Sequence, residues 1–286
     1  MSFSPRFTAL EGFRLTRREP RLVLFLALLH SAVLMLAFAI NPEGVRQLLV
    51  LMQQIVPGTQ LTEAQSAALM QASFNATSTV ILPVLLLEVV TQAAIARGVL
   101  TPGKDHLGFL RLGRDEVRVM GTCIVVWLAM TFAMFAALMI VGLIAGIAMA
   151  GVQALMLVAM AVGVAAAVGM VWLAVKFMLS VPISMTEQKV GVIDSFKATS
   201  GLFWPLLGTV GLAFLLAMAV GILVALIGQP FMSMTGGLEG FAEGKTGVVM
   251  LAGVAVWVLF NALANAAKSV LLYAPLTAVW AVLRHK

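Results

Sequence analysis

The feature that most constrains this chain is a set of apolar runs, each about as long as a membrane is thick. The run FAMFAALMIVGLIAGIAMA, residues 132–150, has no charged residue and is apolar on every face of a helix. A helix of about 20 such residues crosses about 30 Å of hydrocarbon. A barrel strand would instead show about ten residues of alternating apolar and polar side chains. The runs therefore predict helices that span a membrane.

Composition agrees with an all-α, polytopic membrane protein. Of the 286 residues, 62% are hydrophobic and 10% are charged, whereas a soluble domain has roughly 45–50% and about 25%. We predict six transmembrane helices, close to residues 21–40, 78–97, 119–148, 153–181, 204–228 and 248–283. They fill the chain, so we expect a single transmembrane domain over residues 1–286.

Positive charge is distributed unevenly between the connections, which predicts the orientation of the chain. Cytoplasmic connections of membrane proteins are enriched in Lys and Arg. The predicted outer side has only Arg46 and Lys245. The predicted cytoplasmic side has Arg6, Arg14, Arg17, Arg18, Arg21, Arg97, Lys104, Arg111, Arg114, Arg118, Lys189, Lys197, Arg284 and Lys286. Both termini are therefore expected in the cytoplasm, and the net charge of +6 reflects topology and contact with anionic lipid, with no nucleic-acid partner.

A short motif is repeated at the start of odd-numbered spans. EGFRLT at residues 11–16 precedes the first span, and DSFKAT at residues 194–199 precedes the fifth. GFLRLGR at residues 108–114, before the third span, resembles them with one residue inserted. Each segment is amphipathic, as in helices that lie in the membrane interface. The predicted interfacial residues are Phe13, Arg14, Phe109, Arg111, Phe196 and Lys197.

The motif predicts three parallel units, each an interfacial helix followed by a helical hairpin. Their approximate limits are residues 4–97, 104–182 and 187–284. A second sequence similarity supports the same division. The fourth and sixth spans contain VKFMLSVP and AKSVLLYAP, and in each segment a proline follows a lysine after six or seven positions. All three units run in the same sense, so we expect a parallel repeat and not the inverted kind that is common in transporters.

Three charged residues lie inside the predicted spans, where each costs roughly 2.5–3.5 kcal/mol on insertion scales. They are Glu88, Lys176 and Lys268, one on each returning helix. Asn261 and Asn265 extend the polar stripe of the sixth span. We expect Glu88 to form an ion pair with Lys268 or Lys176, since an unpaired carboxylate in hydrocarbon is unfavourable. Two interpretations stay open, a binding site for a headgroup, anion or proton, and an ion pair that fixes helix packing.

Residues 180–212 resemble part of a known family. The segment SVPISMTEQKVGVIDSFKATSGLFWPLLGTVGL is similar to the membrane domain of glycerophosphoryl diester phosphodiesterases and its stand-alone bacterial six-helix relatives, whose function is largely unknown. The matching positions are Pro182, Glu187, Gly191, Ser195, Phe196, Lys197, Gly201 and Trp204. The resemblance implies a six-helix fold and a bacterial inner-membrane location. It transfers no catalytic residue, because the phosphodiesterase activity belongs to a separate soluble domain.

These patterns lead to two hypotheses about function. The first is a non-enzymatic multi-pass inner-membrane protein that binds or organises lipid, a partner membrane protein or a second copy of itself. The alternative is a small transporter or permeation pathway with a polar site between the returning helices. We expect no catalytic residue, no cofactor and no metal site in either case.

The orientation can be tested by labelling single cysteines from outside the cell. We expect that a cysteine placed at Gly240 reacts with a membrane-impermeant reagent in intact cells and that one placed at Leu110 does not, because the basic connections lie inside. Both variants are made in a background that lacks Cys123. Labelling at Leu110 without labelling at Gly240 would reverse the predicted topology.

Overall fold

Every secondary-structure element described in the computed structural model is an α-helix, which confirms the prediction of an all-helical chain. The structure describes residues 8–44, 46–47, 51, 62–78, 80–101, 103, 109, 113–149, 154–235 and 247–284. The helices are α2 (Glu11–Arg18), α3 (Pro20–Ile40), α5 (Glu63–Ser78), α6 (Ile81–Leu100), α7 (Arg114–Met149), α8 (Ala154–Phe177), α9 (Ser180–Glu187), α10 (Val192–Ala198), α11 (Phe203–Thr235) and α13 (Val248–Leu283).

Within these ranges, five helical segments are long and apolar enough to cross a membrane. They are Ile81–Leu100, Arg114–Met149, Leu155–Glu187, Phe203–Gly228 and Ala252–Leu283. A sixth candidate is the pair α2 and α3, which are bent by 95° relative to each other. Five or six apolar helices are compatible with the predicted multi-pass membrane protein.

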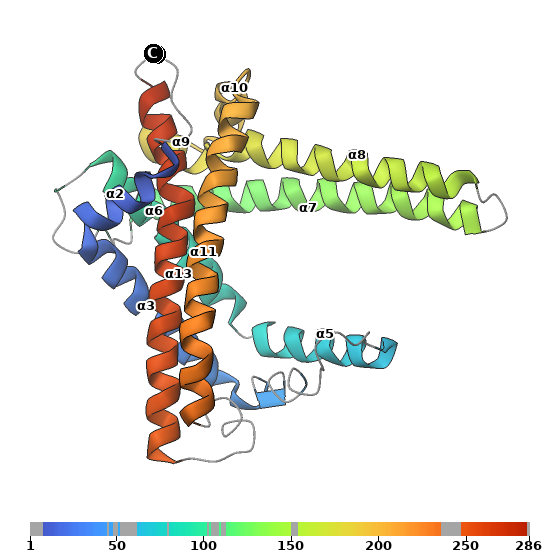
Figure 1. Ribbon diagram of the computed structural model, residues 1–286. Helices are drawn as coiled ribbons and strands as arrows, with labels where there is room; N and C mark the ends of the chain where they lie inside the picture. The colour runs from blue at the N-terminus through green and yellow to red at the C-terminus, as the bar shows by residue number, and fades with distance from the viewer. Residues whose placement is uncertain are drawn as a thin grey trace.

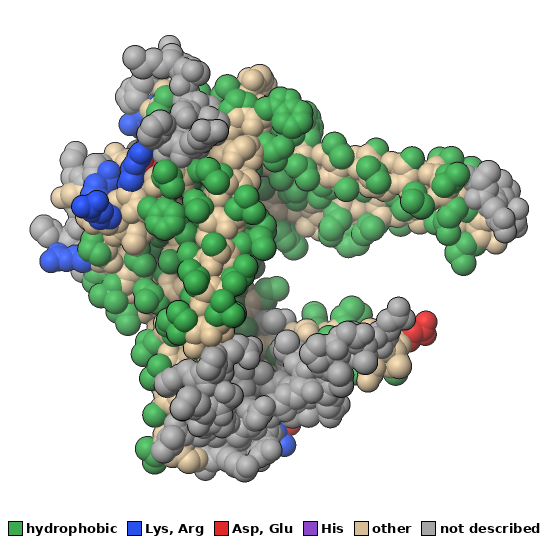
Figure 2. Space-filling model, in the orientation of Figure 1, with side chains coloured by type: hydrophobic (Ala, Val, Ile, Leu, Met, Phe, Trp, Pro, Cys, Tyr) green, Lys and Arg blue, Asp and Glu red, His purple; other side chains and the backbone are tan. Residues whose placement is uncertain are grey.

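The helices form an upright bundle from which a hairpin extends to one side (Figure 1). Helices α11 and α13 lie side by side, and α3 and α6 also pack against α13. The hairpin of α7 and α8 leaves this bundle and runs across its direction. Apolar side chains cover the exposed surface of both parts, while Lys and Arg side chains gather near α2 (Figure 2).

Small residues on α13 allow its neighbours to approach closely. Ala262, Ala266 and Ala274 are fully buried, and the last two belong to the main core cluster together with Leu26 and Ile95. Small side chains favour close packing between membrane helices, where the hydrophobic effect drives little association. Helix α13 is therefore the element around which α2, α3, α6, α9 and α11 assemble.

The returning helix of the hairpin is broken between α8 and α9. The repeated motif DSFKAT (residues 194–199) packs against this break. Pro182 cannot donate a backbone hydrogen bond, so the helix cannot pass through this point without losing one. Ser195 bonds to two backbone groups at the break. Its hydroxyl donates to the Lys176 carbonyl at 2.7 Å and accepts from the Leu179 N–H at 3.2 Å. Helix α10 is thereby fixed to the end of α8.

The turn between α9 and α10 is held by buried and exposed polar contacts. The Gly191 N–H donates to the Ser184 hydroxyl at 2.9 Å. On the surface, Lys189 lies 2.8 Å from a Glu187 oxygen and 2.9 Å from an Asp194 oxygen. These carboxylates raise the pKa of Lys189 above its usual value, because they accept hydrogen bonds from its charged form.

The repeated motif EGFRLT (residues 11–16) also packs against a returning helix. Its Gly12 contacts α13. A Cβ atom added to Gly12 would lie 2.7 Å from the Leu271 Cα atom of α13. Leu15, one turn later, is fully buried, whereas Leu10 and Phe13 are 42% and 46% exposed. Helix α2 thus presents one face to the protein and a second apolar face to its surroundings, as an interfacial helix does.

The packing of α2 predicts different outcomes for two helical Gly→Ala substitutions. Gly12→Ala should lower stability by about 1–3 kcal/mol, because the added methyl group overlaps the backbone of α13. Gly211→Ala on α11 is the control, since its Cβ would meet no atom within 4 Å and alanine favours helix. Thermal unfolding of the detergent-purified variants compares them. Equal stability of the two variants would contradict the close contact.

Candidate functional site

A large cavity lies where the α7–α8 hairpin leaves the bundle. Its volume is about 770 Å³, and its walls come from α6, α7, α8, α9, α11 and α13. This volume is within the range of roughly 300–1,000 Å³ typical of small-molecule sites. The polar residues among those that line it are Glu88, Gln92, Cys123, Ser180, Tyr273 and Thr277.

Glu88 is at the centre of a small hydrogen-bond network in this cavity. The Tyr273 hydroxyl donates to its Oε1 atom, and the Gln92 amide donates to the same oxygen at 2.9 Å. The Cys123 thiol in turn lies 3.8 Å from the Gln92 side-chain oxygen. The network joins α6, α7 and α13, and α13 is far from the other two helices in sequence.

The rest of the cavity wall is mainly apolar and aromatic. Leu85 of α6, Trp127 of α7, Phe177 of α8 and Leu276 of α13 all line it. The cavity thus combines a mainly apolar wall with a small group of polar side chains, as small-molecule sites usually do. Within the described ranges, no three His, Cys, Asp or Glu side chains are grouped to hold a metal.

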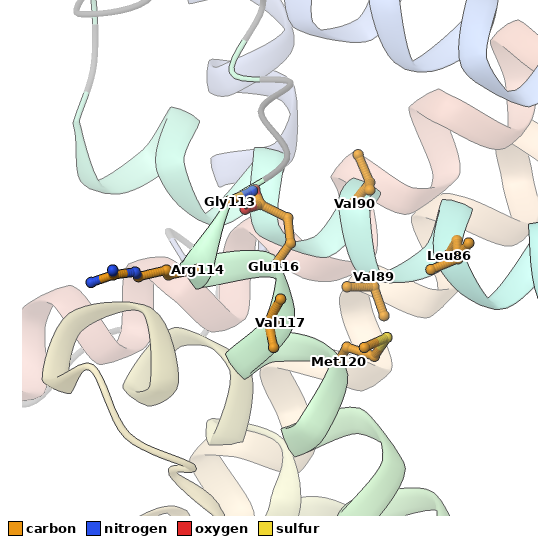
Figure 3. A pocket seen from close by; sticks show the side chains of 8 residues that line it. All are labelled: Leu86, Val89, Val90, Gly113, Arg114, Glu116, Val117 and Met120. Carbon is orange, nitrogen blue, oxygen red and sulfur yellow. Dashed lines mark hydrogen bonds between the residues drawn. The ribbon is translucent and has the colours of Figure 1, made fainter.

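A smaller hollow of about 490 Å³ adjoins this cavity between α6 and α7. The two spaces have Leu86, Val89 and Met120 in common. Figure 3 shows these apolar side chains on one side of the hollow and Arg114 pointing away from them. The guanidinium of Arg114 is therefore not aimed at the apolar lining.

A buried ion pair connects α6 to the start of α7 beside this hollow. Arg97 pairs with Glu116, and their side chains are 13% and 7% exposed. Arg97 also donates to the Phe109 carbonyl at 2.7 Å, and the Gly113 N–H donates to Glu116 at 2.8 Å. Such a pair fixes helix positions, since removing one partner leaves a buried charge.

The structure does not bring together the five intramembrane residues singled out from the sequence. In the described part of the chain, no ion pair joins Glu88 to Lys176 or Lys268, so the predicted pairing is wrong. Tyr273 and Gln92 supply donors to Glu88 instead.

Each lysine has a separate environment. The Lys176 Nζ atom lies 4.9 Å from the centre of the Phe196 ring, 5.5 Å from that of Trp172 and 3.4 Å from the Ser200 hydroxyl. Aromatic faces attract cations, which gives this buried lysine a neutral partner. Lys268 faces α11, where a Cβ atom on Gly221 would lie 3.9 Å from the lysine Cδ atom.

The two asparagines do not extend the Glu88 network. The Asn261 amide donates to the Trp257 carbonyl of its own helix at 3.0 Å. Asn265 is half-buried and has no hydrogen bond among the described residues. Neither residue is part of the cavity wall within the described ranges.

The predicted interfacial residues differ in their exposure. Phe13 is 46% and Phe196 is 37% exposed, but Phe109 is 1% exposed and belongs to the main core cluster. Arg14 pairs with Glu11 at 3.3 Å, and Lys197 is exposed. Arg111 lies outside the described residues. The three phenylalanines are thus not equivalent in burial, because Phe109 inserts between helices at a backbone φ of 64°.

Sequence analysis missed Tyr273, Gln92 and Ser180 as parts of the site. Two signals were available. Tyr273 is the only tyrosine in the chain and is placed inside an apolar helix, where a hydroxyl requires a partner. Gln92 follows Glu88 by four positions, so the two side chains share one face of α6.

The network predicts which substitutions interact. Tyr273→Phe should reduce stability by about 1–2 kcal/mol, because Glu88 loses a donor in a region without water. Combined with Glu88→Gln, it should have less effect than the sum of the two single changes. Glu88→Gln combined with Lys268→Met should be additive. Unfolding midpoints in detergent measure both double-mutant cycles. Coupling of Glu88 to Lys268 without coupling of Glu88 to Tyr273 would contradict the structure.

Comparison with known proteins identifies no relative from which a function could be transferred. No protein-family model, curated protein or solved structure matches the chain.

Proposed function

We propose that this chain is a non-enzymatic, multi-pass membrane protein that binds an amphiphilic lipid-like molecule in the cavity between α6, α7 and α13. The single observation that carries the proposal is the combination of an apolar chamber with a carboxyl group held at its wall by Tyr273 and Gln92. Amphiphiles have the same division between a hydrocarbon chain and a polar head. Membrane lipids are then the principal partners.

The proposed location is a bacterial inner membrane, with both termini in the cytoplasm. The excess of Lys and Arg in one set of connections supports this orientation. The similarity of residues 180–212 to the membrane domain of glycerophosphoryl diester phosphodiesterases supports the bacterial origin. The interactions of Ser195 and Gly191, two of the matching positions, give that segment a structural role at the α8–α9 break.

We also propose that the chain consists of three repeated units. In two of the units, the small residue of the repeated motif (Gly12 or Ser195) contacts the returning helix of another unit. The contact lies close to the lysine of that returning helix. Gly12 meets α13 at Leu271, three residues after Lys268. Ser195 contacts the Lys176 carbonyl and the Leu179 N–H. For the remaining unit, the contact between Arg97 of α6 and the Phe109 carbonyl is the corresponding link.

The proposed function can be tested with a neutral alkyl probe that carries a photoreactive group in its chain. In lipid nanodiscs, the probe should crosslink to the cavity residues of the wild-type protein. Ala174→Phe should reduce this labelling several-fold, because Ala174 lines the cavity and the larger ring fills it. The control, Ala161→Phe, lies on an exposed part of the same helix and should label normally. If the two variants are labelled equally, and no more than a lipid-facing part of a helix is labelled, the proposed site is rejected.

The alternative function is a small transporter. The observation that favours it is a carboxyl group inside a span that borders a cavity, since such groups often form part of ion or substrate pathways. Reconstituted vesicles distinguish the two functions. A probe flux that requires the protein and is lost in Glu88→Gln would indicate transport, whereas cavity labelling without flux would indicate binding alone.

A further inference from the structure

We infer that the cavity selects an amphiphile with a positively charged ammonium head, which it holds against Glu88. This inference rests on the proposed function and specifies the chemical class of its ligand. Four features of the described residues lead to it, namely the unused oxygen of Glu88, the absence of a cation beside it, the composition of the cavity wall and the hydroxyl of Ser180.

The carboxyl group of Glu88 is only half satisfied by the protein. Tyr273 and Gln92 both donate to Oε1. Oε2 accepts no hydrogen bond from any described residue. A carboxylate has about four lone-pair positions on its two oxygens, so the network fixes the orientation of the group and leaves one oxygen for a ligand.

No protein cation neutralises this group in the part of the chain that the structure describes. Lys176 is held by aromatic rings and Ser200, and Lys268 faces α11 at Gly221. Among the described residues that line the cavity, Glu88 is the only one with a formal charge. A charged group away from water is stabilised by an opposite charge, and an ammonium head supplies one.

The same wall disfavours other kinds of head. A phosphate or sulfate would face the carboxylate without a Lys or Arg to bind it, and like charges in such a site repel. A zwitterionic phospholipid meets the same difficulty at its phosphate. A neutral hydroxyl head could bond to Oε2, but it would leave the charge of Glu88 unbalanced.

Ser180 is a second polar group of the cavity wall that lacks a partner in the described part of the protein. This residue lines the cavity and is 1% exposed, yet its hydroxyl has no hydrogen-bond partner among the described residues. Buried hydroxyls are normally paired. The hydrocarbon chain of the ligand would then lie against Leu85, Trp127 and Leu276.

The experiment compares three photoreactive probes with the same alkyl chain and different heads, trimethylammonium, hydroxyl and sulfate, in phosphatidylcholine nanodiscs. Crosslinks to cavity peptides are divided by crosslinks to the lipid-facing Leu138–Leu143 stretch of α7, which corrects for the amount of probe in the bilayer. The ammonium probe should label the cavity at least about tenfold more than the hydroxyl probe, as expected for a contact with a charged group. The sulfate probe should label it least.

Glu88→Gln should remove the preference of the cavity for the ammonium probe over the hydroxyl probe. Glu63→Gln is the matched control, because it removes the same charge from exposed helix α5 and should keep the preference. Equal labelling by ammonium and hydroxyl probes in the wild-type protein would overturn the inference while the proposed function stands. If no probe labels the cavity above the α7 reference, the proposed function fails as well. If Glu88→Gln does not fold, the comparison of probes on the wild-type protein decides the matter.

Discussion

A polar group buried between helices must find its hydrogen-bond partner inside the protein, and this constraint determines how the described helices are joined. Ser195 supplies the partners that the α8–α9 break requires. The Thr122 and Ser184 hydroxyls bond to each other at 2.7 Å between α7 and α9, and the Trp280 indole donates to Thr186 at 2.8 Å. These contacts link helices that apolar packing alone would leave free to slide.

The Glu88 network follows from the same constraint but is left incomplete. Tyr273 and Gln92 restrict the carboxyl group through one oxygen, and Glu88 lines the cavity at the place where the α7–α8 hairpin leaves the bundle. A packed core would close such a space, since interiors are normally dense. The cavity and the unbalanced carboxyl group therefore belong to one site, and an ammonium amphiphile satisfies both the volume and the charge.

Much of the fold could be predicted from the sequence, because helix length and polarity are local properties. Residues 132–149 of the apolar run lie in α7 (Arg114–Met149), and the predicted span 248–283 coincides with α13. The site could be predicted only in part. Charge alone suggested that Glu88 pairs with a lysine, but the partner is decided by which faces of α6 and α13 meet. That depends on the packing of small residues such as Ala266 and Ala274, which no local pattern specifies.

The most direct test of this account is a structure of the protein in neutral nanodiscs, determined with an alkyl ammonium compound bound. The account predicts density for the compound in the cavity between α6, α7 and α13, with its nitrogen within ion-pair distance of Glu88 Oε2 and the Tyr273 hydroxyl still on Oε1. A structure in which the hairpin packs down to fill this space, or in which a lysine occupies the second oxygen of Glu88, would contradict it.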